Sequence, residues 1–188
     1  LARALWARRG EGLRLLVESF IALGIVFTTL AIPLAFDGRW TSAAWALEGA
    51  AIVWIGVRQQ RLLARVFGML LQLLAGFFYL GDLHWRGDAW PLLNSVFLGA
   101  LLLASSGLLC AWLLQRSPQG LHTAERWLAI VFFGWGSAWW IFAGMHEIDA
   151  HVRSALQGNA LLAFFSGSSL AFSELTQRLR WPLARYPA

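Results

Sequence analysis

Long apolar runs constrain this chain more than any other feature, because each has about the length needed to cross a lipid bilayer. Short polar segments separate six such runs, at residues 15–36, 41–57, 62–80, 90–114, 124–145 and 152–175. A hydrocarbon core of about 30 Å requires roughly 17–25 residues of helix. The runs are continuous rather than alternating, which argues against membrane strands. The sequence therefore predicts an all-α, polytopic bundle of six transmembrane helices.

The composition favours a membrane environment over a nucleic-acid partner. The chain is 59% hydrophobic and 13% charged, whereas soluble domains are roughly 45–50% apolar and about 25% charged. All 15 basic residues are arginines and the net charge is +5. These arginines form short clusters between the apolar runs, as in the loops of membrane proteins. We therefore expect a single transmembrane domain over residues 1–188, with membrane lipids and no nucleic acid as partners.

The distribution of arginine predicts the orientation in the membrane. Twelve of the 15 arginines lie at the two termini and in or within four residues of the turns after the second and fourth runs. The other three turns hold only Arg39, Arg86 and Arg153. Cytoplasmic loops of membrane proteins carry an excess of positive charge. Both termini are therefore expected in the cytoplasm.

Parts of the sequence resemble one another at intervals of about fifty residues or more. A turn ending in tryptophan and followed by a Gly-Ala pair occurs at 37–50 and again at 87–100. The segment 46–52 is also similar to 155–161. Three tandem helical hairpins would explain both matches, as parallel repeats do in some transporters. Chance similarity between helices rich in Ala, Leu and Gly is the open alternative.

Small residues inside the apolar runs are expected to serve helix packing. Gly49 and Gly56 are seven residues apart and share a helix face, and Gly68 and Gly76 are eight apart. Small residues let helix backbones approach closely in lipid. Cys110 has no second cysteine to pair with and is expected to be another small packing residue.

Glu48 is the strongest candidate for a functional side chain. It lies about seven residues into the second run, or near 10 Å from its outer end. A charge at such depth costs at least about 2.5 kcal/mol on insertion scales, so it usually faces a partner, a cavity or water. Expected polar partners on other helices are Gln72, Asn94, Ser95 and Gln157. Two interpretations remain open: a proton or substrate site, and a neutral carboxylic acid hydrogen-bonded between helices.

Acidic residues and histidines gather in two of the expected outer turns. One turn holds Asp82, His84 and Asp88, and the other holds His146, Glu147, Asp149 and His151. Imidazole and carboxylate groups bind metals, but these spacings match no recognised zinc motif. His84, His146 and Asp149 are therefore weak metal candidates, and His146 and Asp149 share a face only if the fifth helix extends that far. A solvated acidic rim is the alternative.

Several common catalytic motifs are absent from the sequence. It contains no Gly-x-Ser-x-Gly, no phosphate-binding loop with lysine, no Cys-x-x-Cys and no dinucleotide fingerprint. An enzyme with an unfamiliar site is not excluded by this. We expect no cofactor and assign no catalytic residue.

The sequence of the second run and of the turn before it resembles a family of bacterial predicted membrane proteins, domain of unknown function 2339. The most specific segments are Ala31–Thr41 (AIPLAFDGRWT), Ala44–Ala50 (AWALEGA) and Trp54–Gly56. Arg65–Gly68 and Glu147–Asp149 are also similar to it. The resemblance covers most of the chain.

The resemblance implies a location in the bacterial inner membrane and supplies neither an activity nor a catalytic residue. Members are typically longer, and this sequence starts at Leu1 without a methionine. We therefore expect it to be a segment of a larger polytopic protein, and the rest of that chain or other envelope proteins are expected partners. The leading functional expectation is transport or organisation of cell-envelope components through a polar site around Glu48. A membrane-embedded enzyme acting on a lipid-linked substrate at the outer face and a structural scaffold are the alternatives.

Overall fold

The computed structural model describes residues 24, 38–81, 90–116, 123–179 and 181. Contacts divide the chain into two compact units, Leu1–Asp37 and Gly38–Ala188. In the first unit only Gly24 is described, and it is helical. The expected first span, 15–36, otherwise lies outside the described residues, and the single domain over residues 1–188 stays a prediction.

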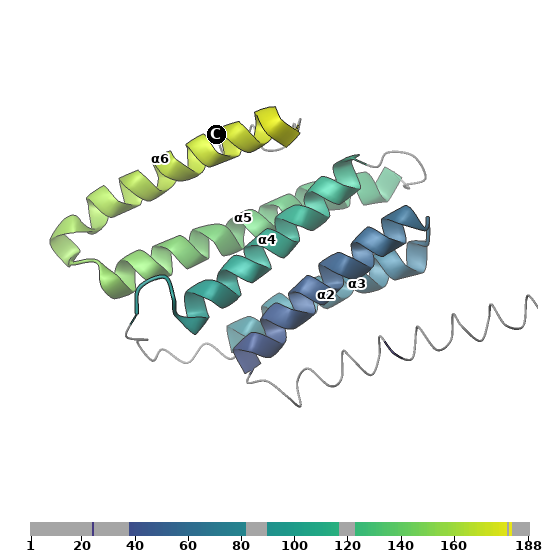
Figure 1. The fold of residues 1–188 in the computed structure, drawn as a ribbon, viewed down its shortest axis with the longest axis horizontal. Helices are drawn as coiled ribbons and strands as arrows, with labels where there is room; N and C mark the ends of the chain where they lie inside the picture. The colour runs from purple at the N-terminus through teal and green to yellow at the C-terminus, as the bar shows by residue number, and fades with distance from the viewer. Residues whose placement is uncertain (1–23, 25–37, 82–89, 117–122, 180, 182–188) are drawn as a thin grey trace, which may run out of the picture. The chain divides into compact units, whose positions relative to one another are not determined.

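All regular structure among the described residues is helical, and Figure 1 shows the five helices of the second unit. They are α2 (Gly38–Arg58), α3 (Leu62–Gly81), α4 (Ser95–Arg116), α5 (Thr123–His151) and α6 (Ser154–Leu179). By length and composition, α2 to α5 could each cross a membrane. The all-α class is thus confirmed, together with several helices that are long and apolar enough to cross a membrane. α6 has 26 residues but does not meet the same measure, so six spans remain a prediction.

Three of the helices follow the predicted apolar runs within a few residues, and α4 and α5 differ from them. α5 continues six residues past the expected end at residue 145, so the polar residues from His146 to His151 are helical. α4 begins at Ser95, five residues after the predicted start at Trp90. A folded turn that includes Pro91 takes the place of the first helical turn.

α2 and α3 approach each other closely through facing glycines. A Cβ atom added to Gly49 would lie 2.7 Å from the carbonyl oxygen of Gly68, and one added to Gly68 would lie 2.6 Å from the carbonyl oxygen of Gly49. Further along the same face, Gly56 lies against Arg65. Gly49 and Gly56 therefore share the face that packs on α3, as predicted from their spacing. Hydrogen on Cα in place of a methyl group permits this approach.

α4 and α5 also pack closely against each other through glycines. A Cβ on Gly136 would lie 2.7 Å from the backbone nitrogen of Leu108, and one on Gly107 would lie 3.0 Å from the Cα of Gly136. The most extensive helix contacts are within α2–α3 and α4–α5, and α2 also packs on α4. Three hairpins of the expected kind would instead pair α3 with α4 and α5 with α6, which contact each other less. The threefold repeat is therefore not confirmed.

α2 is followed by a residue with a left-handed backbone conformation, in the turn that leads to α3. Gln60 has φ 56°, in the region that favours glycine. The Arg61 amide donates to the Gly56 carbonyl at 2.9 Å, and the Gln60 amide donates to the Val57 carbonyl at 3.3 Å. This pair of bonds is the Schellman arrangement. It satisfies carbonyls at the helix end and lets α3 return at once along α2.

Two buried apolar clusters stabilise the helices from inside. One contains Val53, Cys110 and Phe132, which are almost wholly buried, and the other is built around Tyr79 and Leu103. Cys110 is thus a packing residue, as expected. The clusters lie along α2 to α5, whereas α6 adds only Phe172 to the fully buried set.

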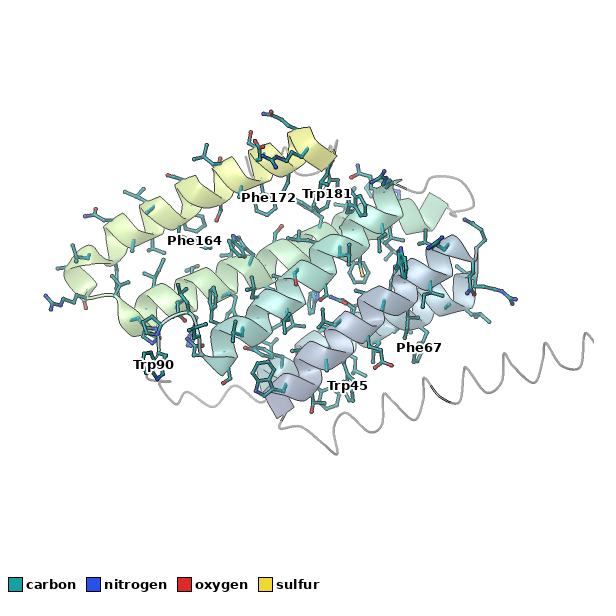
Figure 2. The ribbon with its side chains drawn as sticks, viewed as in Figure 1. Trp45, Phe67, Trp90, Phe164, Phe172 and Trp181 are labelled. Atoms are coloured by element: carbon teal, nitrogen blue, oxygen red, sulfur yellow. The ribbon has the colours of Figure 1, made fainter. Side chains whose placement is uncertain are left out.

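α6 packs on α5 mainly through aromatic side chains. Phe164 and Phe172 project from α6 toward α5, and Trp181 lies beyond its end (Figure 2). The ring of Phe133 on α5 lies 6.1 Å from that of Phe172 and 5.4 Å from that of Trp181. These contacts anchor the carboxyl end of α6.

Candidate functional site

Gln72 lies at the centre of the helices and is fully buried. It is 2.7 Å from the hydroxyl of Ser106 on α4. One orientation of the Gln72 amide matches the hydrogen-bonding groups around it. The amide nitrogen then donates to the Ala46 carbonyl at 2.7 Å, and the amide oxygen accepts from Ser106 at 2.7 Å and from the Gly107 amide at 2.9 Å. The side chain then bonds to α2 and α4 from its place on α3. Buried amides with complete hydrogen bonding fix helix register.

Glu48 is half-buried, and its Oε2 atom is screened from solvent. Residues Ala46, Gly49 and Val53 of α2 are buried, whereas exposed Leu47 and half-buried Glu48 lie on either side of this buried face. Its carboxylate therefore borders the buried face of α2.

Three of the side chains expected around Glu48 make their hydrogen bonds elsewhere. Gln72 bonds to Ser106 and, in the orientation given above, to the Ala46 carbonyl and the Gly107 amide. Asn94 donates to Glu147, and Gln157 donates to the Val152 carbonyl at 3.3 Å and lies 3.5 Å from Asp149. The described hydrogen bonds of these residues do not gather around Glu48, and the role assigned to each stays a prediction.

The structure instead brings polar groups together around Glu147, near the end of α5. The residue is 7% exposed. Oε1 accepts a hydrogen bond from the Leu92 amide at 2.6 Å, and Oε2 accepts one from the Asn94 side chain at 2.8 Å. Asn94 is also the amino-terminal cap of α4, because its Oδ1 accepts from the Phe97 amide at 2.6 Å. One carboxylate of α5 thus holds the turn that begins α4.

This turn has a strained backbone, which Glu147 helps to maintain. Leu92 has φ 62°, and a left-handed conformation costs a residue with a side chain roughly 1–2 kcal/mol. The strained conformation directs the Leu92 amide at the carboxylate. Residues held in this way cluster at functional sites.

His151 adds an ionisable group to the same carboxylate. Its Nδ1 lies 3.1 Å from Oε1 of Glu147, one helical turn away on α5. The pair is an ion pair whenever the imidazole is protonated. A carboxylate beside an imidazole also orients the ring, which is the arrangement used in general acid–base catalysis.

Two cavities lie between α5 and the first half of α6, one on each side of Ile148. The Glu147 cavity has a volume of about 330 Å³ and is formed mainly by Phe97, Trp140, Glu147, Ala160 and Phe164. The Asp149 cavity has a volume of about 370 Å³ and is formed mainly by Phe142, His146, Asp149, Gln157 and Leu161. Volumes of roughly 300 Å³ and above are typical of small-molecule sites.

Two of the three weak metal candidates line one of these cavities. His146 and Asp149 share the Asp149 cavity, so the condition that the fifth helix reaches them is met. Among the described residues, no three His, Cys, Asp or Glu side chains are placed so that they could hold a metal ion together. Asp82, His84 and Asp88 lie outside the described residues, and the metal assignment stays a prediction.

Sequence reasoning counted Glu147 as one of several rim residues and missed its central place. The available signals were the helix-breaking Pro91 and the capping residue Asn94, since a turn at that point exposes backbone amides that need an acceptor. The acceptor comes from 55 residues further along the chain. No local pattern indicates that contact.

Comparison with known proteins supports the membrane assignment. The family of predicted membrane proteins described as domain of unknown function 2339 (DUF2339) matches residues 1–187. No curated protein and no solved structure matches the chain. The match covers nearly the whole sequence, and four of its described helices are long and apolar enough to cross a bilayer. The chain is therefore a multi-pass integral membrane protein and belongs to the DUF2339 family.

Proposed function

We propose that this protein acts in transport or in the organisation of cell-envelope components in the bacterial inner membrane, through an intramembrane polar site around Glu48. Both termini lie in the cytoplasm in this proposal, as the arginine distribution predicts. Six spans would follow if the region before α2 and α6 both cross the bilayer. Membrane lipids, the remainder of a longer chain and other envelope proteins are the proposed partners.

The position of Glu48 is the observation that carries the proposal. A carboxylate stands within α2, a helix apolar enough to cross a bilayer, and one of its oxygens is screened from solvent. Ionisable groups at such positions are costly and usually mark a pathway or a pairing surface. Gly49 and Gly56 make the close contact of α2 with α3, so this contact does not itself require a carboxylate at residue 48.

Infrared difference spectroscopy tests this on the full-length protein in liposomes. The carboxyl band of Glu48 is identified by its loss in Glu48→Gln and followed as the buffer pH is changed. A band that titrates means that water and protons reach the carboxylate, as transport requires. Glu174→Gln is the matched control, because Glu174 is an exposed carboxylate paired with Arg178. If the Glu48 band stays in one protonation form throughout, transport through this residue is refuted and a structural scaffold is favoured.

A second candidate is a membrane-embedded enzyme that acts on a lipid-linked substrate at the predicted outer face. The 3.1 Å contact of His151 with buried Glu147, beside a cavity, is the observation that favours it. Mass spectrometry of lipid extracts incubated with the full-length protein would show a converted species. The conversion should be lost in His151→Gln. Equal conversion by this variant would exclude the pair as the catalytic group.

A further inference from the structure

We infer that the Glu147 cavity binds an amphipathic cation, that is, an apolar or aromatic body carrying an amine or ammonium group. The inference goes beyond the proposed function and does not depend on Glu48. It rests on the composition of the cavity wall and on the acceptor capacity of one buried carboxylate.

The wall of the cavity is apolar and aromatic on three sides. Phe97 comes from α4, Trp140 from α5 and Phe164 from α6. The rings of Trp140 and Phe164 are stacked, with centroids 5.7 Å apart. Aromatic faces attract cations and also contact apolar groups well. Such a wall suits a ligand with an apolar body and a positive end.

Glu147 supplies the charge that selects the ligand. A carboxylate has about four acceptor positions. The Leu92 amide and the Asn94 side chain fill two of them, and Nδ1 of His151 lies 3.1 Å from Oε1. The Leu92 and Asn94 donors are neutral, and His151 compensates the carboxylate charge only when its imidazole is protonated. While the imidazole is neutral, a cation in the cavity supplies the compensating charge.

The described side chains that line the two cavities include no permanent positive charge that would repel a cation. Among the described residues that line the two cavities there is no arginine or lysine, and the ionisable ones are Glu147, His146 and Asp149. His151, next to Glu147, becomes positive on protonation. An anionic headgroup such as a phosphate would meet the Glu147 carboxylate in this cavity. Charge complementarity therefore favours a cation.

A matched set of small probes tests the inference on the purified full-length protein in neutral detergent. The probes are 4-phenylbutylamine, 4-phenylbutanol and 4-phenylbutyrate, which share one apolar body and differ in the charge of the head. Calorimetric titration, corrected with protein-free micelles, measures each dissociation constant. The amine is expected to bind saturably and about tenfold more tightly than the carboxylate. Equal affinity for the amine and the carboxylate would overturn the inference.

Two variants locate the site. Ala160→Leu fills the cavity without touching the carboxylate and should weaken amine binding about tenfold, because the added side chain occupies the ligand's volume. Ala163→Leu makes the same change at an exposed position on α6 and should leave binding unchanged. Glu147→Gln should remove the preference for the amine over the alcohol. Amine binding that survives Ala160→Leu at wild-type strength would place the ligand elsewhere and refute the inference, whatever the fate of Glu147→Gln.

Discussion

Replacing Gly49 with alanine should force α2 and α3 apart. The added Cβ would lie 2.7 Å from the Gly68 carbonyl oxygen and 3.1 Å from the Gln72 backbone nitrogen. Ordinary contacts of a Cβ begin at 3.4 Å, so the nearer atom must retreat by about 0.7 Å, and it cannot rotate away because it belongs to the backbone. The helices must therefore separate along the seam, and contacts beyond the substituted residue loosen too.

Overpacking of this kind costs about 1–3 kcal/mol, and the better helix propensity of alanine returns at most about 1 kcal/mol. We expect a net destabilisation of about 1–2 kcal/mol, measured as a lower unfolding midpoint of the full-length protein in a mild detergent. Gly134→Ala is the control, since a Cβ there meets nothing within 4 Å, and its midpoint should stay equal or rise. If Gly49→Ala is as stable as Gly134→Ala, the close approach of α2 and α3 is refuted.

Three further substitutions are checked by the same unfolding assay. Tyr79→Phe removes the 2.6 Å bond from the buried hydroxyl to the Val96 carbonyl and should cost about 1 kcal/mol; an unchanged midpoint would contradict that bond. Asn94→Ala removes both the cap of α4 and a donor to Glu147, for a loss of about 1–3 kcal/mol; a smaller loss than that of Tyr79→Phe would argue against the double role. Gln60→Gly relieves a left-handed residue and should stabilise by up to about 1 kcal/mol, whereas a lower midpoint would show that the side chain contributes more than the strain costs.

The helices were predictable because their signal is local. A run of apolar residues about twenty long has few alternatives in lipid, where every backbone group needs an internal partner. The predicted run at 62–80 and the observed α3, Leu62–Gly81, accordingly agree closely. The start of α4 was not predictable to the same accuracy, because Leu92 is held out of the helix by a carboxylate that is distant in sequence.

The candidate site was predictable only as a list of residues. Depth in the membrane can be counted along a helix, which is how Glu48 was chosen, but the direction of a side chain depends on how neighbouring helices are rotated. Gln72 and Asn94 were expected to meet Glu48, whereas each bonds to a different helix partner. Choosing among such pairings requires the helix arrangement, because several polar side chains stand at similar depths.

The position of the cavities follows from the way each helix pair is held together. α2 and α3 approach through Gly49 and Gly68, and backbone contact at that distance leaves no space between the helices. α6 has glycines too, but a Cβ on either Gly158 or Gly167 would meet nothing within 4 Å. The α5–α6 seam depends instead on large side chains, and the indole nitrogen of Trp140 donates to Ser168 at 2.9 Å across it. Bulky rings hold the helices at a distance that smaller neighbours do not fill, so open volume collects beside this seam, where the buried carboxylate of α5 also lies.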